Sequence, residues 1–74
     1  MSRVHLRQNA FERWIIVNAV DEGAAWSGSR FVPITEAGFP ASDAQVSNFD
    51  TRDDAAEYAT DFGFEIVDTP TPIN

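Results

Sequence analysis

The sequence has no cysteine, no lysine and a single histidine, His5. Without cysteine the chain forms neither a disulfide framework nor a cysteine-based zinc site, and one imidazole cannot make a histidine cluster. No apolar run approaches the roughly 20 residues of a membrane span, and the charged start lacks the apolar core of a signal peptide. These absences predict a small cytoplasmic protein with no membrane insertion, bound metal or cofactor.

Negative charge is concentrated in the second half of the sequence. Residues 1–30 carry four arginines against three acids, a balance of +1, whereas residues 31–74 carry one arginine against nine acids, a balance of −8. Phosphate binding needs Lys and Arg to displace counterions, so this charge disfavours direct binding to nucleic acid or acidic membranes. Many acids without lysine also fit adaptation to high salt, which would have no bearing on function.

Short runs rich in β-branched and aromatic residues predict strands at 3–7, 13–20, 45–49 and 64–67. The stretch 26–34 predicts a turn at Ser27-Gly28-Ser29 and then a short strand interrupted by Pro33. The run 13–20 is apolar on both faces, which indicates a central strand, and Pro33 places its own strand at an edge or a strand end. In the first run Val4 and Leu6 alternate with polar residues, so we expect His5 to point outward into solvent.

The stretch "NFDTRDDAAEYATDFGFEIVD" (48–68) predicts a helix over about 51–62 followed by a final strand at 64–67. Thr51 is a good N-cap, and Gly63 is suited to the left-handed position that ends a helix. The apolar stripe of this helix consists of Ala55, Tyr58, Ala59 and Phe62. The predicted fold is a single α+β domain over 1–67, in which the helix covers one face of a mainly antiparallel sheet of three to five strands. A flexible tail is expected at 68–74.

The acidic residues of this stretch raise the question of catalysis or metal binding. Asp50, Asp53, Asp54, Glu57 and Asp61 are dense enough to suggest paired carboxylates, but most fall on the face opposite the alanines. "DTRDDAAEYATD" lacks the central glycine of a calcium loop, and "WSGSR" lacks the flanking glycines of a nucleophile elbow and the ending of a phosphate loop. We therefore predict a solvated helix face and a turn, with no catalytic residues.

Two segments are candidates for contact with another protein. The Gly- and Pro-rich loop at 35–44 is one, because loops carry recognition on rigid scaffolds. The turn after Trp26 is the other, and Trp26 itself is predicted either to pack in a thin core or to be an exposed anchor. The partner-binding hypothesis comprises Trp26, Ser27, Ser29, Arg30, Phe39, Asp53, Asp54, Glu57 and Asp61.

The segments "AAWSGSR" (24–30) and "VSNFDTRDDAAEYATDFGFEIV" (46–67) resemble the C-terminal core of the 18-kDa accessory subunit family of respiratory complex I. The residues that match the family pattern in order are Trp26, Ser27, Ser29, Phe49, Asp50, Thr51, Ala55, Tyr58, Ala59, Gly63 and Val67. Arg30 stands where the family usually has an acid, and the spacer between the two segments is longer. The resemblance implies a cofactor-free accessory subunit of an NADH dehydrogenase, without catalytic residues.

Two functions remain after these exclusions. The leading hypothesis is a non-catalytic interaction or structural module, because the chain lacks a nucleophile, base and metal constellation. The alternative is a small acidic phage-encoded inhibitor, an anti-CRISPR or other anti-defence protein of the DNA-mimic type. Such a mimic would occupy a basic nucleic-acid groove of a host enzyme and lose it steeply as salt rises.

Overall fold

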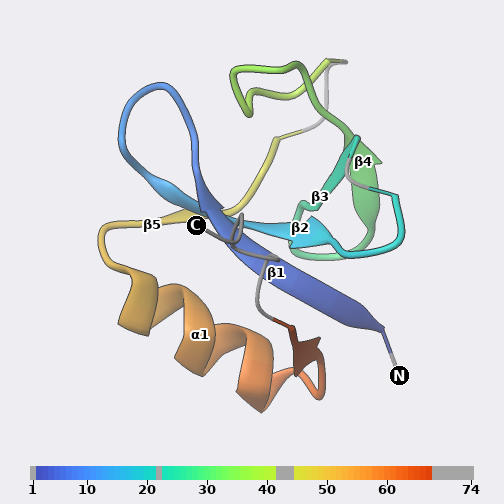
Figure 1. Cartoon of the computed structure of the whole chain (residues 1–74), viewed down its shortest axis with the longest axis vertical. Coiled ribbons are helices and arrows are strands. Elements are labelled where there is room, and N and C mark those ends of the chain that lie inside the picture. Colours follow the sequence, from blue (N-terminus) through green and yellow to red (C-terminus); the bar gives the residue numbers. More distant parts are fainter. Residues whose placement is uncertain (1, 22, 42–44, 68–74) are drawn as a thin grey trace, which may run out of the picture.

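The computed structural model describes residues 2–21, 23–41 and 45–67, so the predicted tail at 68–74 lies outside the described residues. Within them the chain forms a six-stranded sheet and one helix (Figure 1). In chain order the elements are β1 (Arg3–Gln8), β2 (Trp14–Asn18), β3 (Ala24–Trp26), β4 (Phe31–Pro33), β5 (Asn48–Phe49), α1 (Arg52–Asp61) and β6 (Glu65–Ile66). The α+β class predicted from the sequence is confirmed.

The sheet is ordered β4-β3-β2-β1-β6, and β5 pairs with the start of β2. β2 therefore has neighbours along both edges, which confirms the prediction of a central strand from its apolar faces. β4, with Pro33 at its end, forms one edge. The sheet has one strand more than predicted among the described residues, because the alanine-rich β3 also pairs on both sides. All pairs are antiparallel except β1 with β6.

Helix α1 begins and ends as the sequence predicts. The Thr51 hydroxyl accepts a hydrogen bond from the backbone N–H of Asp54 at 3.1 Å. At the other end Gly63 has φ +90°, and the N–H of Phe64 donates back to the carbonyl of Ala59 at 3.0 Å, as in a Schellman motif. This cap turns the chain directly into β6. No helix among the described residues is long and apolar enough to cross a membrane.

Both faces of the sheet are covered. In Figure 1, α1 lies on one side of β1 and β2, and the green segment that follows β4 lies on the other. The buried cluster under the helix consists of Val4, Ile16, Trp26 and Ala59. The cluster on the opposite face consists of Ile15, Val17, Ala25, Val32 and Val46, with Ile34 packed against it. Successive residues of β2 thus enter two different cores, as strand geometry requires.

His5 belongs to the second of these faces. It lies opposite Val17 in the antiparallel β1–β2 pair, so both side chains point to the same side of the sheet. Its side chain is buried, with 6% of its surface exposed. The prediction of a solvated His5 is therefore wrong. Side chains of β1 do alternate between the two faces of the sheet as predicted, but the prediction assumed that only one of these faces is covered.

The described part of the loop predicted at 35–44 is folded onto this second face. Thr35 donates its N–H to the Phe39 carbonyl at 2.8 Å, and Ala10 donates its N–H to the Ala37 carbonyl at 2.9 Å. Between them Gly38 is buried at φ +86°, close to Asn9 and to the Cδ1 of Ile15. The segment is thus part of the core covering, and residues 42–44 lie outside the described part of the chain.

Candidate functional site

Two adjacent grooves mark the surface around the start of β2. The first, here called the acidic groove, has a volume of about 490 Å³. Its lining residues come from the end of the β1–β2 loop, from β5 and the residue after it, and from α1: Arg13, Asn48, Phe49, Asp50, Asp54, Glu57, Tyr58 and Asp61. The second, the apolar groove, has a volume of about 390 Å³. It is lined by Asn9, Phe11, Arg13, Ile15, Gly38, Phe39, Pro40, Val46 and Asn48. The two grooves share Arg13 and Asn48 in their linings and are therefore adjacent.

Helix α1 supplies one wall of the acidic groove. Asp54, Glu57 and Asp61 follow a spacing of three and then four residues, which aligns their side chains along one side of a helix. All three residues are exposed to solvent. Asp53 is exposed too, but it does not line the groove. The buried Ala55 and Ala59 on the opposite side hold the helix against the sheet, so the carboxylates face outward.

Arg13 lies at the junction of the two grooves. Its Nε donates to the Asn48 Oδ1 at 2.8 Å, and its Nη1 forms an ion pair with the Asp50 carboxylate. Asn48 in turn donates its side-chain amide to the Val46 carbonyl at 3.2 Å, which orients its oxygen toward Arg13. The Arg13–Asp50 ion pair is solvent-exposed, so it contributes at most about 1 kcal/mol to stability. Its main effect is to place one positive charge among the carboxylates.

Phe11 and Phe39 form the open wall of the apolar groove. Their ring centroids lie 4.9 Å apart with the planes tilted by 57°, an arrangement that aromatic pairs favour. Phe11 exposes 76% of its surface, whereas Phe39 is partly buried. Ile15 and Val46 are buried residues of the core that also line this groove. An apolar surface is thereby left open to solvent at one end of the sheet.

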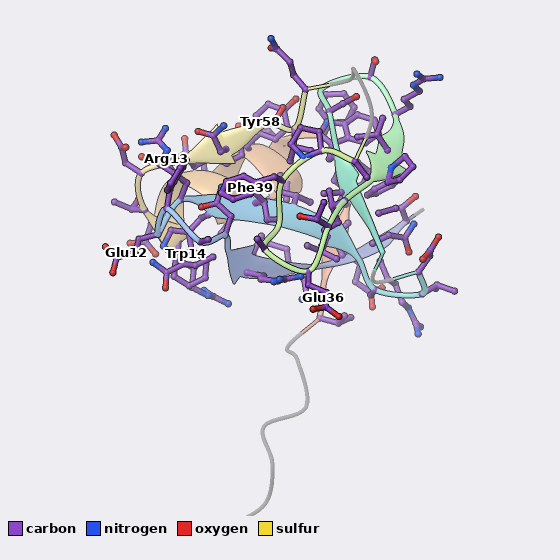
Figure 2. All side chains as sticks on the ribbon, turned by 90° about the horizontal axis from the view of Figure 1, so that it is seen from above. Glu12, Arg13, Trp14, Glu36, Phe39 and Tyr58 are labelled. Carbon is purple, nitrogen blue, oxygen red and sulfur yellow. The ribbon has the colours of Figure 1, made fainter. Side chains whose placement is uncertain are left out.

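The loop between β1 and β2 holds Phe11 in place. The side-chain oxygen of Asn9 accepts hydrogen bonds from the N–H groups of Phe11 and Arg13, at 2.9 and 3.1 Å. The following residue, Glu12, has φ 63°, a left-handed conformation that costs a non-glycine residue about 1–2 kcal/mol. Figure 2 shows Glu12, Arg13 and Trp14 at the same end of the molecule as Phe39. Phe11 is thus presented by a tightly bonded loop.

The structure divides the predicted contact residues into two groups. Phe39 lines the apolar groove, and Asp54, Glu57 and Asp61 line the acidic groove. Ser27, Ser29 and Arg30 lie in the β3–β4 turn and line neither groove. Within that turn the Ser27 hydroxyl donates to the Arg30 carbonyl at 2.8 Å, which gives Ser27 a structural role.

Trp26 is not an exposed anchor, because only 7% of its surface is accessible. Its ring packs edge-on against Phe31, Phe62 and Phe64, with centroid separations of 5.2, 5.1 and 5.0 Å. Its indole Nε1 donates to the Tyr58 hydroxyl at 3.3 Å. Trp26 is a core residue that ties β3 to the helix, so of its two predicted alternatives packing in the core is confirmed and the exposed anchor is wrong.

The groove residues that the predicted contact set missed include Phe11, Arg13 and Asn48. Phe11 did leave a signal, because a large apolar residue stands in "QNAFER" between two predicted strands, where turn residues are usually polar. Arg13 and Asn48 left none, because their contact joins segments 35 residues apart. Among the described residues, no three His, Cys, Asp or Glu side chains are grouped so that they could hold a metal ion.

No family model, curated protein or solved structure matches this chain. The resemblance to the 18-kDa accessory subunit family therefore stays a prediction made from the residues. The candidate site is thus defined by its geometry alone, an apolar groove beside an acidic one.

Proposed function

We propose that this chain is a non-catalytic protein-binding module whose contact surface is the pair of grooves around Arg13. The observation that carries the proposal is Phe11, which exposes 76% of its surface although hydrogen bonds to Asn9 fix its loop. Fully burying a phenylalanine side chain gains about 1.5–3 kcal/mol, so a partner covering this exposed fraction would gain about 1–2 kcal/mol before the cost of association.

The positions of the reactive side chains support a binding role. His5, the single histidine of the sequence, is buried on the face of the sheet opposite the helix and lines neither groove. The carboxylates of the acidic groove are solvent-exposed and lie beside Arg13, an arrangement that attracts a basic surface. General acid–base catalysis at neutral pH usually places such groups in a desolvated site.

Two settings fit a module of this kind. One is an accessory subunit of an NADH dehydrogenase-like complex, which the resemblance implies. The other is an acidic inhibitor, of phage or other origin, that occupies the nucleic-acid groove of an enzyme. The second is favoured by the acidic groove, since four of its lining side chains are carboxylates and one is an arginine.

The experiment that tests the proposal is capture of a partner by the tagged protein from a lysate of the source cells, followed by reconstitution with the purified partner. Phe11→Ala removes the exposed ring, and Val20→Ala is the matched control, because Val20 is 88% exposed and lines neither groove. We expect the first variant to lose the partner and the second to keep it. Equal binding by the two variants, or turnover of a substrate by the purified protein, would overturn the proposal.

Washing the captured complex with high salt or with DNA distinguishes the accessory-subunit role from the inhibitor role. A complex with respiratory-chain subunits that survives high salt would assign the accessory role, because apolar contacts are insensitive to screening. A nucleic-acid enzyme that is released by added DNA, or by about 0.5 M salt, where charges are screened within a few Å, would assign the inhibitor role.

A further inference from the structure

The apolar groove and the acidic groove are arranged so that one ligand could occupy both. Arg13 and Asn48 line both grooves, so this hydrogen-bonded pair lies between the apolar groove and the carboxylates of α1. The apolar side ends at Phe11 and Phe39, and the acidic side ends at Asp61 in the last turn of the helix. The surface therefore changes from apolar to anionic along a single path.

We propose that the joined grooves bind an extended basic segment of a partner protein, with one aromatic or long aliphatic side chain in the apolar groove and Lys or Arg side chains along α1. This inference rests on the proposed protein-binding function and names the chemistry of the partner. The charge of the acidic groove indicates which kind of segment binds there. The groove carboxylates Asp50, Asp54, Glu57 and Asp61 outnumber its arginine, so a cationic segment is attracted and an acidic one is repelled.

A second copy of this chain does not fit the same site. The protein carries a net charge of −7, and most of that charge lies in the second half, which contains α1. A symmetric dimer through the grooves would place the same acidic surface on both sides of the interface. Like charges facing one another across an interface cost several kcal/mol, so the apolar gain from Phe11 and Phe39 would be offset.

The dimensions of α1 agree with an extended ligand. Asp54 and Asp61 are seven residues apart on the helix, which at 1.5 Å per residue is roughly 10 Å. An extended peptide advances about 3.3 Å per residue, so roughly three of its residues span that distance. Alternate side chains of such a peptide point to the same side. Two basic residues separated by one other residue lie about 6.6 Å apart and would therefore face Glu57 and Asp61, which are four helix residues, roughly 6 Å, apart.

The test uses the whole protein and a fluorescein-labelled synthetic peptide of about eight residues, long enough for both grooves, with one Trp followed by Arg at alternate positions. Two control peptides replace either the Trp by Ser or the arginines by Gln. Binding is measured by fluorescence anisotropy at low salt and at about 0.5 M salt. We expect the Trp–Arg peptide to bind at least tenfold more tightly than either control, and to weaken in high salt.

The variants separate the two halves of the site. Phe11→Ala should weaken the Trp–Arg peptide about tenfold and leave the Ser control peptide unchanged, because that peptide has no side chain for the apolar groove. Glu57→Gln with Asp61→Asn should weaken peptides that contain arginine. The matched control is Asp53→Asn with Asp21→Asn, which removes the same charge from exposed positions outside both grooves.

Equal weakening by the two charge variants would show non-specific attraction and overturn the proposal. So would unchanged binding of the Trp–Arg peptide by Phe11→Ala, or binding of the Gln control peptide as tightly as the Trp–Arg peptide. The proposed function fails separately, when Phe11→Ala and Val20→Ala bind the purified partner equally. If Phe11→Ala loses the partner while no peptide binds, the protein-binding function stands and the extended basic segment is excluded.

Discussion

The close packing of Gly38 allows a quantitative test of how the segment after β4 is held on the sheet. A Cβ atom at position 38 would lie 2.8 Å from the Cβ of Asn9, 3.1 Å from its Cα, and 3.3 Å from the Cδ1 of Ile15. The Asn9 atoms belong to the backbone or lie next to it, in a loop fixed by hydrogen bonds, so they cannot rotate away. Gly38→Ala therefore forces either the segment or the loop to shift.

The expected cost has two parts. The left-handed backbone at φ +86° costs an alanine about 1–2 kcal/mol, and overpacking of this kind costs about 1–3 kcal/mol more. Gly63→Ala is the matched control, because Gly63 has φ +90° but nothing within 4 Å of a Cβ. The control should lose only the backbone part. Any gain from a less flexible unfolded chain is similar in both variants and cancels in the comparison.

The assay is urea and thermal unfolding of both variants, followed by circular dichroism. For a domain of this size 1 kcal/mol shifts the melting temperature by about 4–8 °C, so Gly38→Ala should melt roughly 4–24 °C below Gly63→Ala. Equal midpoints for the two variants would refute the reasoning. They would mean that the segment containing Gly38 is not held against Asn9 and Ile15.

Three further substitutions test the helix and the core by the same unfolding measurements. Thr51→Ala should lose about 1 kcal/mol because the helix loses its N-cap, whereas Thr51→Ser should keep most of it; equal losses would mean that the hydroxyl does not cap the helix. Ala59→Leu should lose about 1–3 kcal/mol because Ala59 is fully buried on the face of α1 that packs against the sheet, and an unchanged midpoint would place that face in solvent. Trp26→Ala should lose about 3–5 kcal/mol, whereas a loss below about 1 kcal/mol would contradict a core position.

The parts of the fold that could be predicted are those encoded by neighbouring residues. Thr51 and Gly63 act through hydrogen bonds within a few residues, so the limits of α1 were visible in the sequence. The two apolar faces of β2 likewise required burial on both sides. The environment of His5 was not visible, because it depends on whether a distant loop covers that face. β3 was missed since Ala24 and Ala25 have low strand propensity and gain their place by pairing with two neighbours.

The candidate site follows the same division. The carboxylates of α1 were identified because helical spacing alone sets them in a row. Arg13 and Asn48 meet through the pairing of β2 with β5, and the predicted strand at 45–49 did not indicate which strand it would pair with. Trp26 was ambiguous because a tryptophan suits both a core and an interface, and only the surrounding Phe31, Phe62 and Phe64 rings decide between them.

The parallel pairing of β6 with β1 has a consequence for how the protein is made. The N–H of Glu65 donates to the Ser2 carbonyl at 2.9 Å, and the N–H of Val67 donates to the Val4 carbonyl at 2.8 Å. β1, the first strand of the described residues, thus completes its hydrogen bonds only with the last of them. Pairing between strands so far apart in the sequence slows folding, because the entropy of closing the intervening loop is lost before the stabilising contacts form. On the ribosome β1 would wait as an open strand edge until residue 67 has emerged, and a chain arrested before β6 would expose that edge to other proteins.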